Sequence, residues 1–203
     1  MFGTVVKRLL FLTGNAGKLA EASHFFEPLG YHVEQFLIDG EVPVVVEPQS
    51  DNLKDVAIAK IEQAKALLNQ SGQNAAIFVE DAGLFIDELG GFPGVNSASV
   101  LTQIGLSGIL KLMSDVANRG AEFRAKAVLF TGEELVFGEG ICRGTITTET
   151  LGEFGFGYDP IFTPDGEASG STFGQMDKSA KEAFSHRAKA LESIKKQLDL
   201  LGR

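Results

Sequence analysis

The sequence LLFLTGNAGK at residues 9–18 decides the fold, because an apolar run passes there into a glycine-containing turn and then into a helical pattern. The four consecutive apolar residues 9–12 predict a buried strand, and residues 13–17 predict a tight loop. From Lys18 onward, apolar residues recur at helical spacing as far as Gly30, a residue typical of helix ends. A buried strand that leads into a helix is the first pair of elements expected of an α/β fold.

The segments that follow continue this alternation of strands and helices. For the first half of the chain, the patterns predict a strand at 32–38, an irregular extended connection at 42–48, a helix at 52–69 with Asn52 as its N-cap, a break at 71–74 and an apolar strand at 75–79 that ends in Glu80-Asp81.

The second half of the chain changes to paired strands. Its patterns predict a turn at 90–94, a helix at 104–116, antiparallel strands at 121–130 and 134–148, a glycine- and proline-rich loop at 152–171 and a last helix from residue 180 onward. We therefore predict a single domain over residues 1–203 with an α/β fold, in which a mixed β-sheet is flanked by helices. The second group of strands is expected to form a second lobe, with the ligand site in the cleft between the lobes.

Composition argues against several classes of protein. A formal net charge of -9 disfavours binding of nucleic acid polymers, which requires a basic face, although a small anion can still bind beside local Lys and Arg residues. Cys142 is the only cysteine, so neither an intramolecular disulfide nor a cysteine-based metal site can form. No segment approaches the roughly 20 apolar residues of a membrane span, so we expect a cytoplasmic protein without membrane contact. The sixteen Phe residues are expected mostly in the core.

The loop Thr13-Gly14-Asn15-Ala16-Gly17-Lys18 is the first candidate site. Backbone N–H groups at a helix N-terminus attract anions, glycine permits close approach, and the lysine adds a full charge. The spacing differs from a P-loop, since only two residues separate the glycines and Leu19 follows the lysine. Alone, the loop fits an ordinary turn between a strand and a helix with an exposed lysine better than it fits a phosphate site.

The adjacent acidic residues Glu80 and Asp81, at the end of a predicted apolar strand, are the second candidate. Carboxylates at the carboxyl end of a strand in an α/β sheet can bind Mg²⁺, and one of them can deprotonate an attacking water. Neighbouring strand residues point to opposite faces, so one of the two is expected to face the ligand. Glu47 is a third carboxylate in the irregular connection. Alone, the acidic pair also fits a solvated strand end.

The segment Gly155-Phe156-Gly157-Tyr158-Asp159-Pro160 is the third candidate. Glycines on both sides of Phe156 leave a ring face open for stacking on a base, and Asp159 can accept hydrogen bonds from a base N–H. A glycine-rich turn with Phe156 packed inward explains the same composition equally well.

Lys181 and the run Ser185-His186-Arg187 form the fourth candidate, at the start of the last helix. Residues 181 and 185 are four apart and share a helical face. Such polar residues are common on surface helices. Together, however, the four segments supply an anion site, a metal site, a base platform and a cationic clamp, which are the parts that cleavage of a nucleotide requires.

In order and spacing, these segments resemble the inosine triphosphate pyrophosphatases, a family also described as non-standard purine NTP pyrophosphatases. The resemblance runs from residue 9 to about 200 and also includes Glu80-Asp81-Ala82-Gly83-Leu84 and Gly91-Phe92-Pro93-Gly94-Val95. It implies an elongated two-lobed fold, a homodimer, and Mg²⁺-dependent hydrolysis of ITP, dITP and XTP to the nucleoside monophosphate and pyrophosphate.

The resemblance also implies roles for individual residues. The triphosphate would be held by Thr13, Gly14, Asn15, Ala16, Gly17 and Lys18, with the help of Lys60. Asp81 would bind the metal and act as the general base, and Glu47 would be a second metal ligand. The nucleobase would be stacked on and read by Phe156, Gly157, Tyr158 and Asp159, and its pocket would be completed by Lys181, His186 and Arg187.

Two positions depart from the family pattern. Ala82 replaces the usual Ser or Thr after the acidic pair, which removes a hydroxyl contact to the substrate, and Glu182 replaces an Asn that is common after Lys181. Two other functions fit parts of the pattern: a septum-inhibitor-like pyrophosphatase with another base preference, and a nucleotide-binding regulator without turnover. The segments at 156–159 and 185–187 argue against the first, and the intact Asp81 and Lys18 argue against the second.

Overall fold

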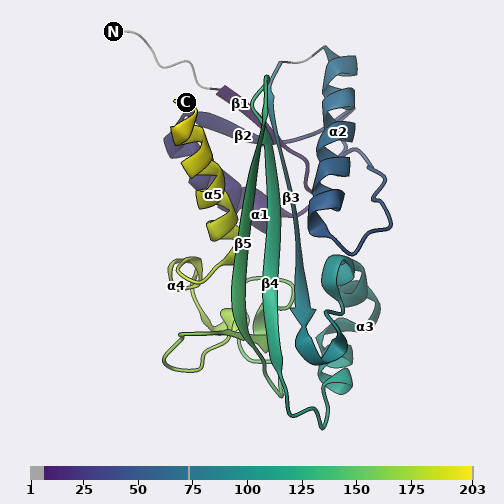
Figure 1. Cartoon of the computed structure of the whole chain (residues 1–203), viewed down its shortest axis with the longest axis vertical. Coiled ribbons are helices and arrows are strands. Elements are labelled where there is room, and N and C mark those ends of the chain that lie inside the picture. Colours follow the sequence, from purple (N-terminus) through teal and green to yellow (C-terminus); the bar gives the residue numbers. More distant parts are fainter. Residues whose placement is uncertain (1–6, 73, 203) are drawn as a thin grey trace. The chain divides into compact units, whose positions relative to one another are not determined.

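The computed structural model describes residues 7–72 and 74–202, and within them the strands form one six-stranded sheet in the order β2-β1-β3-β4-β5-β6 (Figure 1). The strands are β1 (Lys7–Phe11), β2 (Tyr31–Gln35), β3 (Ala76–Ile86), β4 (Gly120–Phe130), β5 (Leu135–Ile146) and β6 (Phe162–Pro164). β1 runs parallel to both β2 and β3, whereas β5 and β6 are antiparallel. The predicted α/β fold with a mixed sheet is therefore confirmed.

The α-helices of the described residues are α1 (Ala16–Phe26), α2 (Leu53–Ser71), α3 (Ser97–Leu112), α4 (Lys178–Glu182) and α5 (His186–Leu200). None of them is long and apolar enough to cross a membrane.

Helix α2 forms as its sequence pattern predicts. Asn52 is the N-cap, and its side chain accepts a hydrogen bond from the backbone N–H of Lys54 at 2.9 Å. Gly72 ends the helix with a left-handed φ of 66°. The buried face consists of Leu53, Val56, Ala57, Ile61, Ala64 and Leu68, the same six residues that the helical spacing predicts.

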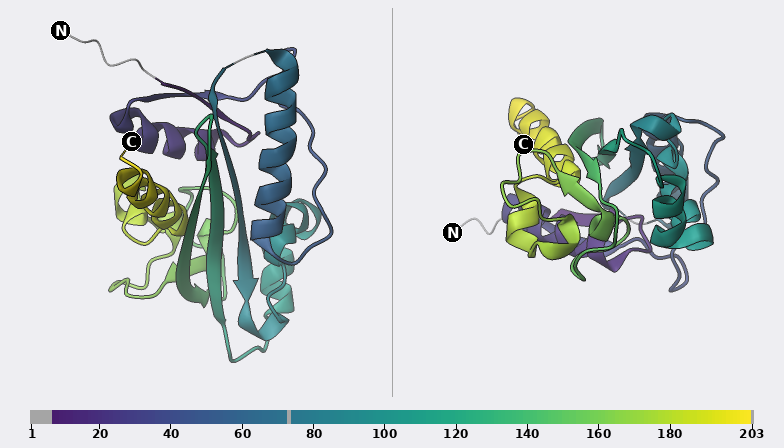
Figure 2. Two further views of the ribbon diagram at one scale, coloured as in Figure 1. Left: turned by 45° about the horizontal axis from the view of Figure 1, so that its top comes forward. Right: turned by 90° about the horizontal axis from the view of Figure 1, so that it is seen from below.

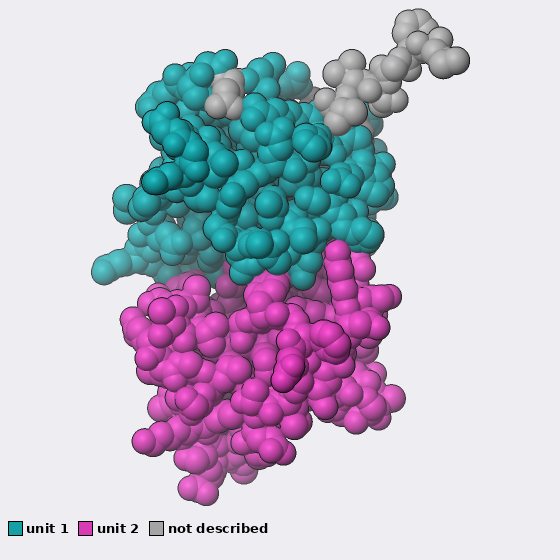
Figure 3. Space-filling view, turned by 180° about the vertical axis from the view of Figure 1, so that it is seen from behind, with its two compact units in different colours: residues 1–81, 126–138, 191–203 teal, residues 82–125, 139–190 magenta. Residues whose placement is uncertain are grey.

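The chain divides into two compact units, shown in different colours in Figure 3. Unit 1 comprises the described residues of 1–81, 126–138 and 191–203, and unit 2 comprises 82–125 and 139–190. Strands β3, β4 and β5 and helix α5 each continue from one unit into the other, so neither unit is a continuous piece of chain. The expectation that a ligand binds in a cleft between two lobes stays a prediction.

The sheet of unit 1 carries a helix on each face. On β3, Ile77 and Val79 belong to the core cluster that contains the buried face of α2, and Figures 1 and 2 show α2 running beside β3. Phe78 lies between them in sequence and so points to the opposite face. There its ring meets that of Phe26 from α1, at a centroid distance of 5.1 Å. This alternation places successive β3 residues against two different helices.

Phenylalanines fill much of the core of unit 2. Phe162 contacts both Phe123 and Phe173, with ring centroids 4.7 and 5.3 Å apart. These rings belong to a buried cluster that also includes Ile109 and Met113. Phe buries a large area without a polar atom to satisfy, which explains its use here.

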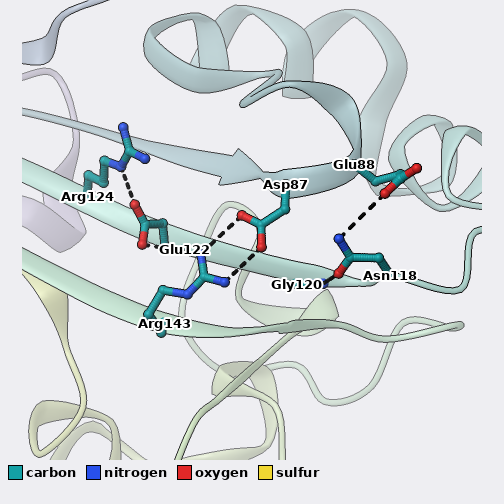
Figure 4. Close-up of polar contacts among 7 residues, drawn as sticks. All are labelled: Asp87, Glu88, Asn118, Gly120, Glu122, Arg124 and Arg143. Atoms are coloured by element: carbon teal, nitrogen blue, oxygen red, sulfur yellow. Dashed lines mark hydrogen bonds and ion pairs between the residues drawn. The ribbon is translucent and has the colours of Figure 1, made fainter.

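Charged side chains connect the strands of unit 2 at its surface (Figure 4). The Arg143 guanidinium donates two hydrogen bonds to the Asp87 carboxylate, at 3.0 and 2.8 Å. Glu122 lies between Arg143 and Arg124 and pairs with both. The network joins β4 and β5 to the residues that follow β3.

Two predicted boundaries in the middle of the chain are wrong. Strand β3 does not end at Glu80-Asp81 but continues to Ile86, because residues 82–86 are small or apolar and are mostly buried. Helix α3 begins at Ser97 rather than at residue 104, and it contains a non-helical Gly105 with a φ of 63°. The glycine interrupts the helical spacing, which is why the pattern predicts only the part from residue 104 onward.

Three boundaries elsewhere also differ. Ser71 belongs to α2 instead of the break that follows it, and Gln73 of that break lies outside the described residues. The loop at 152–171 contains the short strand β6, which pairs with β5. The last helix is divided into α4 and α5, and Ser185 lies between them.

Candidate active site

The loop between β1 and α1 is already shaped by its own side chains. Thr13 Oγ1 accepts a hydrogen bond from the backbone N–H of Asn15 at 3.1 Å, and Asn15 Oδ1 accepts one from the backbone N–H of Lys18 at 3.0 Å. Helix geometry leaves the N–H groups of Ala16 and Gly17, the first residues of α1, without intrahelical partners. The loop therefore presents backbone donors and a lysine at the positive end of a helix, which suits a phosphate.

Asp81 and Glu47 converge on the ammonium of Lys60. Asp81 Oδ1 and Glu47 Oε1 both lie 2.7 Å from Lys60 Nζ. The three residues come from β3, the irregular connection and α2, so they are brought together only by the fold. The side chains of Lys60 and Asp81 are 14% and 13% exposed, whereas that of Glu47 is 54% exposed. Two carboxylates thus share one cation at the edge of the solvent.

The alternation along β3 decides the partners of the acidic pair. Glu80 lies on the face of Phe78, the face of α1, and its carboxylate lies 3.3 Å from Lys18 Nζ. Asp81 lies on the opposite face and meets Lys60 of α2. As predicted from the strand pattern, the two neighbours point to different faces.

Burial and charge act in opposite directions on this group. Burial raises the pKa of Asp81, Glu47 adds to the rise, and Lys60 and Lys18 offset it only in part. Burial alone would lower the pKa of Lys60, but Asp81 and Glu47 together outweigh it and raise that pKa above its usual value. The pKa of Asp81 therefore stays above its ordinary value in spite of two nearby ammonium groups.

The donor set of Glu47 and Asp81 fits Mg²⁺. This ion prefers oxygen ligands and commonly uses one or two carboxylates together with substrate phosphates. Lys60 Nζ is a cation held between both carboxylates, so a positive charge is already favoured at that place. Within residues 7–72 and 74–202, no three Asp, Glu, His or Cys side chains form a metal-binding group, so Glu80 is not brought together with the other two.

In unit 2, Asp159 organises the predicted base-binding segment. Its Oδ2 accepts hydrogen bonds from the backbone N–H of Phe156 at 2.7 Å and from Lys181 Nζ at 2.6 Å. A Cβ at position 155 would lie 2.1 Å from the same oxygen, and φ is 74° there, so Gly155 is required by both space and backbone. The carboxylate closes the turn and anchors the lysine.

Two cations lie beside the ring of Phe156. Lys181 Nζ is 5.0 Å and Arg187 Cζ is 5.2 Å from the ring centroid, both within the range of cation–π attraction. His186, next to Arg187, stacks on Phe123 with ring centroids 4.7 Å apart and an interplanar angle of 9°. Lys181, His186 and Arg187 are all buried. The third and fourth candidate segments are thus brought together in one cluster.

Internal contacts hold both Tyr158 and Asp159, and their expected roles in reading the base stay predictions. Tyr158 is buried, and its hydroxyl donates a hydrogen bond to the carbonyl of Ser97 at 2.7 Å, so its ring belongs to the core. Burial also raises the pKa of Tyr158 to about 12. Asp159 is 3% exposed, and one of its oxygens already accepts two internal hydrogen bonds. Both residues hold the segment in shape.

Ser97 is a structural contact that the sequence patterns missed. Its Oγ accepts a hydrogen bond from the backbone N–H of Leu84 at 2.8 Å and donates one to the carbonyl of Gly94 at 2.6 Å. A Cβ at Gly83 would lie 2.1 Å from the same carbonyl oxygen. Ser97 thereby joins the segments at 82–84, 91–94 and 156–159, and a serine at the start of a helix after a proline-glycine turn is the signal that could have indicated it.

Known proteins are similar to this chain over most of its length. The model of the Ham1 family matches residues 9–197. The chain is 41% identical over 187 residues to the dITP/XTP pyrophosphatase of Thermococcus kodakarensis, covering 92% of this chain and 95% of that protein. It is 42% identical over 194 residues to the dITP/XTP pyrophosphatase of Methanopyrus kandleri, covering 91% and 93%.

A solved structure has the same fold. The Ham1 protein of Staphylococcus aureus superimposes with a TM-score of 0.79 at 28% identity, covering 95% of this chain and 98% of that one. The resemblance inferred from the sequence motifs is thus confirmed by whole-chain matches in both sequence and structure. This chain belongs to the Ham1 family.

Proposed function

We propose that this protein hydrolyses non-standard purine nucleoside triphosphates, namely dITP, XTP and ITP, to the nucleoside monophosphate and pyrophosphate, and so cleanses the nucleotide pool. The observation that carries the proposal is the convergence of Asp81 and Glu47 on Lys60, within the same unit as the N-terminus of α1 and its lysine. The relatives from Thermococcus kodakarensis and Methanopyrus kandleri are named dITP/XTP pyrophosphatases, which supports the choice of substrate.

Unit 1 binds the triphosphate in this proposal. The N–H groups of Ala16 and Gly17 and the ammonium of Lys18 donate to phosphate oxygens, and Thr13 and Asn15 keep the loop in shape. Glu47 and Asp81 would hold Mg²⁺. When bound, this ion supplies charge neutralisation at the phosphate oxygens and a lower pKa for a coordinated water.

Asp81 serves as the general base. Burial raises the pKa of Asp81, which makes its carboxylate a better proton acceptor than an exposed aspartate. The carboxylate takes a proton from water as the water oxygen bonds to the α-phosphorus. The bond from this phosphorus to the bridging oxygen breaks, and pyrophosphate leaves with its charge neutralised by Lys18.

Unit 2 reads the base. The ring of Phe156 offers a stacking surface, and Lys181 and Arg187 beside it are hydrogen-bond donors. Hypoxanthine and xanthine carry an acceptor oxygen at C6, where adenine carries an amino donor. A site built to donate to that position can reject the mismatched base by about 10⁴-fold.

A substrate panel tests the proposal directly. Purified protein with Mg²⁺ is given dITP, XTP, ITP and ATP, and pyrophosphate release is measured for each. We expect turnover of the first three and little turnover of ATP. Equal rates for ATP and ITP would contradict the base-reading site, and binding without turnover would indicate a nucleotide-binding regulator. A preference for pyrimidine nucleotides would indicate the septum-inhibitor-like alternative.

The variant Asp81→Asn tests the base. It keeps the shape of the side chain and removes its charge, so turnover of ITP should fall by about 10²–10⁴-fold while nucleotide binding partly survives. Asp51→Asn, at an exposed position, is the matched control and should retain full activity. Retention of wild-type turnover by Asp81→Asn would remove Asp81 from the mechanism.

The state in which the enzyme acts is part of the same proposal. We propose a homodimer, the state that the family resemblance implies, and exposed apolar side chains such as Phe92, Ile104 and Leu112 of unit 2 are available to its interface. Light scattering after size-exclusion chromatography measures its mass. A cytoplasmic location, where nucleotides are synthesised, fits the function and stays a prediction for cell fractionation.

A further inference from the structure

Burial does not fix the position of Glu47. The residue lies in a segment, 42–48, that has no regular secondary structure, and its side chain is 54% exposed. Two of its neighbours, Val44 and Val46, are 96% and 77% exposed. Only Val42 and Val45 of this segment pack, partly buried, against the core cluster of unit 1. The carboxylate that completes the Lys60 pair is therefore carried by a largely solvated piece of backbone.

The ion pair with Lys60 is also insufficient to hold it. Pairs with an exposed partner gain little from attraction, because water screens the charges and the long side chains lose rotamer freedom. A bound cation would further compete with Lys60 for the same carboxylate. Another contact must therefore keep Glu47 in place when Lys60 shifts.

Gln63 supplies that contact through the backbone. Its Oε1 accepts a hydrogen bond from the N–H of Val46 at 2.8 Å, and its Nε2 donates one to the carbonyl of Val46 at 2.8 Å. Nε2 also donates to the carbonyl of Ala59 at 3.0 Å, which fixes the side chain to its own helix. Both N–H donors of the amide are thus used. The amide of Gln63 thus hydrogen-bonds to both backbone polar groups of Val46, the residue directly before Glu47.

Gln63 and Lys60 lie on the same face of α2. Gln63 lies three residues after Lys60 on α2, so the two side chains are neighbours on adjacent turns. Gln63 holds Val46 while Lys60 meets the next residue, Glu47, at 2.7 Å. Two side chains of α2 therefore fix the position of the Glu47 carboxylate, although the segment 42–48 has no regular structure.

We propose that Gln63 is a positioning residue, which holds the backbone of Val46 so that Glu47 faces Asp81 and the divalent ion of the reaction. This inference rests on the proposed function, since it concerns the metal site of that reaction. Gln63 itself touches neither the substrate nor the ion. Its loss should therefore weaken metal binding at limiting Mg²⁺ but leave the maximal rate nearly unchanged.

The variant Gln63→Met tests the proposal, with Gln70→Met as its matched control. Methionine has nearly the same helix propensity and length as glutamine, and Gln70 is an exposed residue of the same helix. The first measurement is the Mg²⁺ concentration that gives half-maximal pyrophosphate release from ITP. Loss of two hydrogen bonds of ordinary strength should raise it by about 5- to 30-fold in Gln63→Met, with kcat at saturating Mg²⁺ nearly unchanged. Gln70→Met should match the wild type.

Amide hydrogen exchange of the metal-free protein provides a readout independent of activity. The Val46 N–H should exchange faster in Gln63→Met than in the wild type, while the amides of α2 keep their protection and report an intact fold. Should Gln63→Met fail to fold, Gln63→Ala with Gln70→Ala repeats the comparison, since alanine favours helix.

The outcomes separate the two hypotheses. If the wild type is active and Gln63→Met requires the same Mg²⁺ concentration, the role of Gln63 is overturned and the proposed function stands. Equal loss of kcat at all Mg²⁺ concentrations would also overturn it. An inactive wild type would refute the proposed function. Even then, an unchanged rate of hydrogen exchange at the Val46 N–H in Gln63→Met would refute the role of Gln63.

Discussion

The ammonium of one side chain, Lys60, is the shared counter-ion of Glu47 and Asp81. A divalent ion that uses these carboxylates must displace the ammonium or share them with it. Under the proposed function, an ammonium released in this way would be available to the phosphates, which is the role expected of Lys60. Under the proposed function, this site would work by exchange between two cations.

Lys60→Met tests this exchange at the residue scale. The variant keeps the apolar stem and removes the competing charge, so Mn²⁺ alone, without nucleotide, should bind roughly tenfold more tightly, since repulsion between nearby like charges is on the order of 1–4 kcal/mol. Turnover of ITP should fall, because a phosphate contact is lost. Calorimetry measures the Mn²⁺ affinity. Lys65→Met, on the same helix but paired with Glu62, is the control, and weaker Mn²⁺ binding by Lys60→Met would contradict the exchange.

At the scale of elements, a few side chains determine how one segment meets the next. Ser97 bonds to Leu84 and to Gly94, and its carbonyl accepts the hydroxyl of Tyr158. The glycine-rich turn at 90–94 thus has no direct role in the proposed chemistry. It supports the segment that presents Phe156.

Ser97→Ala should therefore destabilise the protein. The N–H of Leu84, whose side chain is fully buried, would lose its acceptor, which costs about 1–3 kcal/mol. Urea unfolding measures this loss of free energy of unfolding. Ser99→Ala, two residues further along the same helix and exposed, should change stability by less than about 0.5 kcal/mol. A similar small effect at Ser97 would show that its hydrogen bonds are not needed.

The Arg143–Asp87 pair of unit 2 makes a pH-dependent contribution to the stability of the fold (Figure 4). The hydrogen bonds from Arg143 lower the pKa of Asp87 in the folded protein. The pair therefore stabilises the fold above the ordinary aspartate pKa, and this stabilisation is lost as pH falls through the lowered value. Because both side chains are more than a third exposed, at 45% and 38%, the contribution is at most about 1 kcal/mol.

Asp87→Asn checks this sign. Wild type should exceed the variant in free energy of unfolding at pH 7, and at an acid pH below the lowered pKa of Asp87 the difference should vanish, because the carboxyl is then protonated in both states. Denaturant unfolding at the two pH values gives the comparison. High salt should also shrink the difference at pH 7. A difference that persists at low pH would trace the effect to packing instead of charge.

On the scale of the whole molecule, the two units are interleaved along the chain. Unit 1 requires residues from both ends and from the middle, including Val128 of β4 in its core cluster. The chain therefore cannot be cut into two foldable halves at Asp81.

A chain ending at Ala190 should accordingly lose the fold of unit 1. It lacks Leu191, Ile194 and Leu198, which are 3%, 0% and 3% exposed, and burial of each contributes about 1.5–3 kcal/mol. The total loss approaches the whole stability of a typical domain, about 5–15 kcal/mol. Circular dichroism and thermal unfolding should show this loss. A chain ending at Asp199, which lacks the exposed Leu200 and Leu201 but none of these three buried residues, should unfold like the full chain.

The sequence by itself determined the features that depend on near neighbours. The buried face of α2 and the alternation of Glu80 and Asp81 follow from repeats of 3.6 and 2 residues. The Asn52 cap and the turn before α1 follow from asparagine side chains that bond to backbone groups two or three residues away. The family motifs indicated the fold and the activity class. The identities of Lys18, Lys60 and Asp81 as site candidates needed no coordinates.

Only the tertiary structure decided the contacts between distant segments. Continuation of β3 to Ile86, the inward position of Tyr158 and the clamp of Gln63 on Val46 depend on which groups meet after folding. The reason is physical: burial and hydrogen-bond partners are properties of the packed chain, and no local pattern specifies a partner that is 17 or 61 residues away.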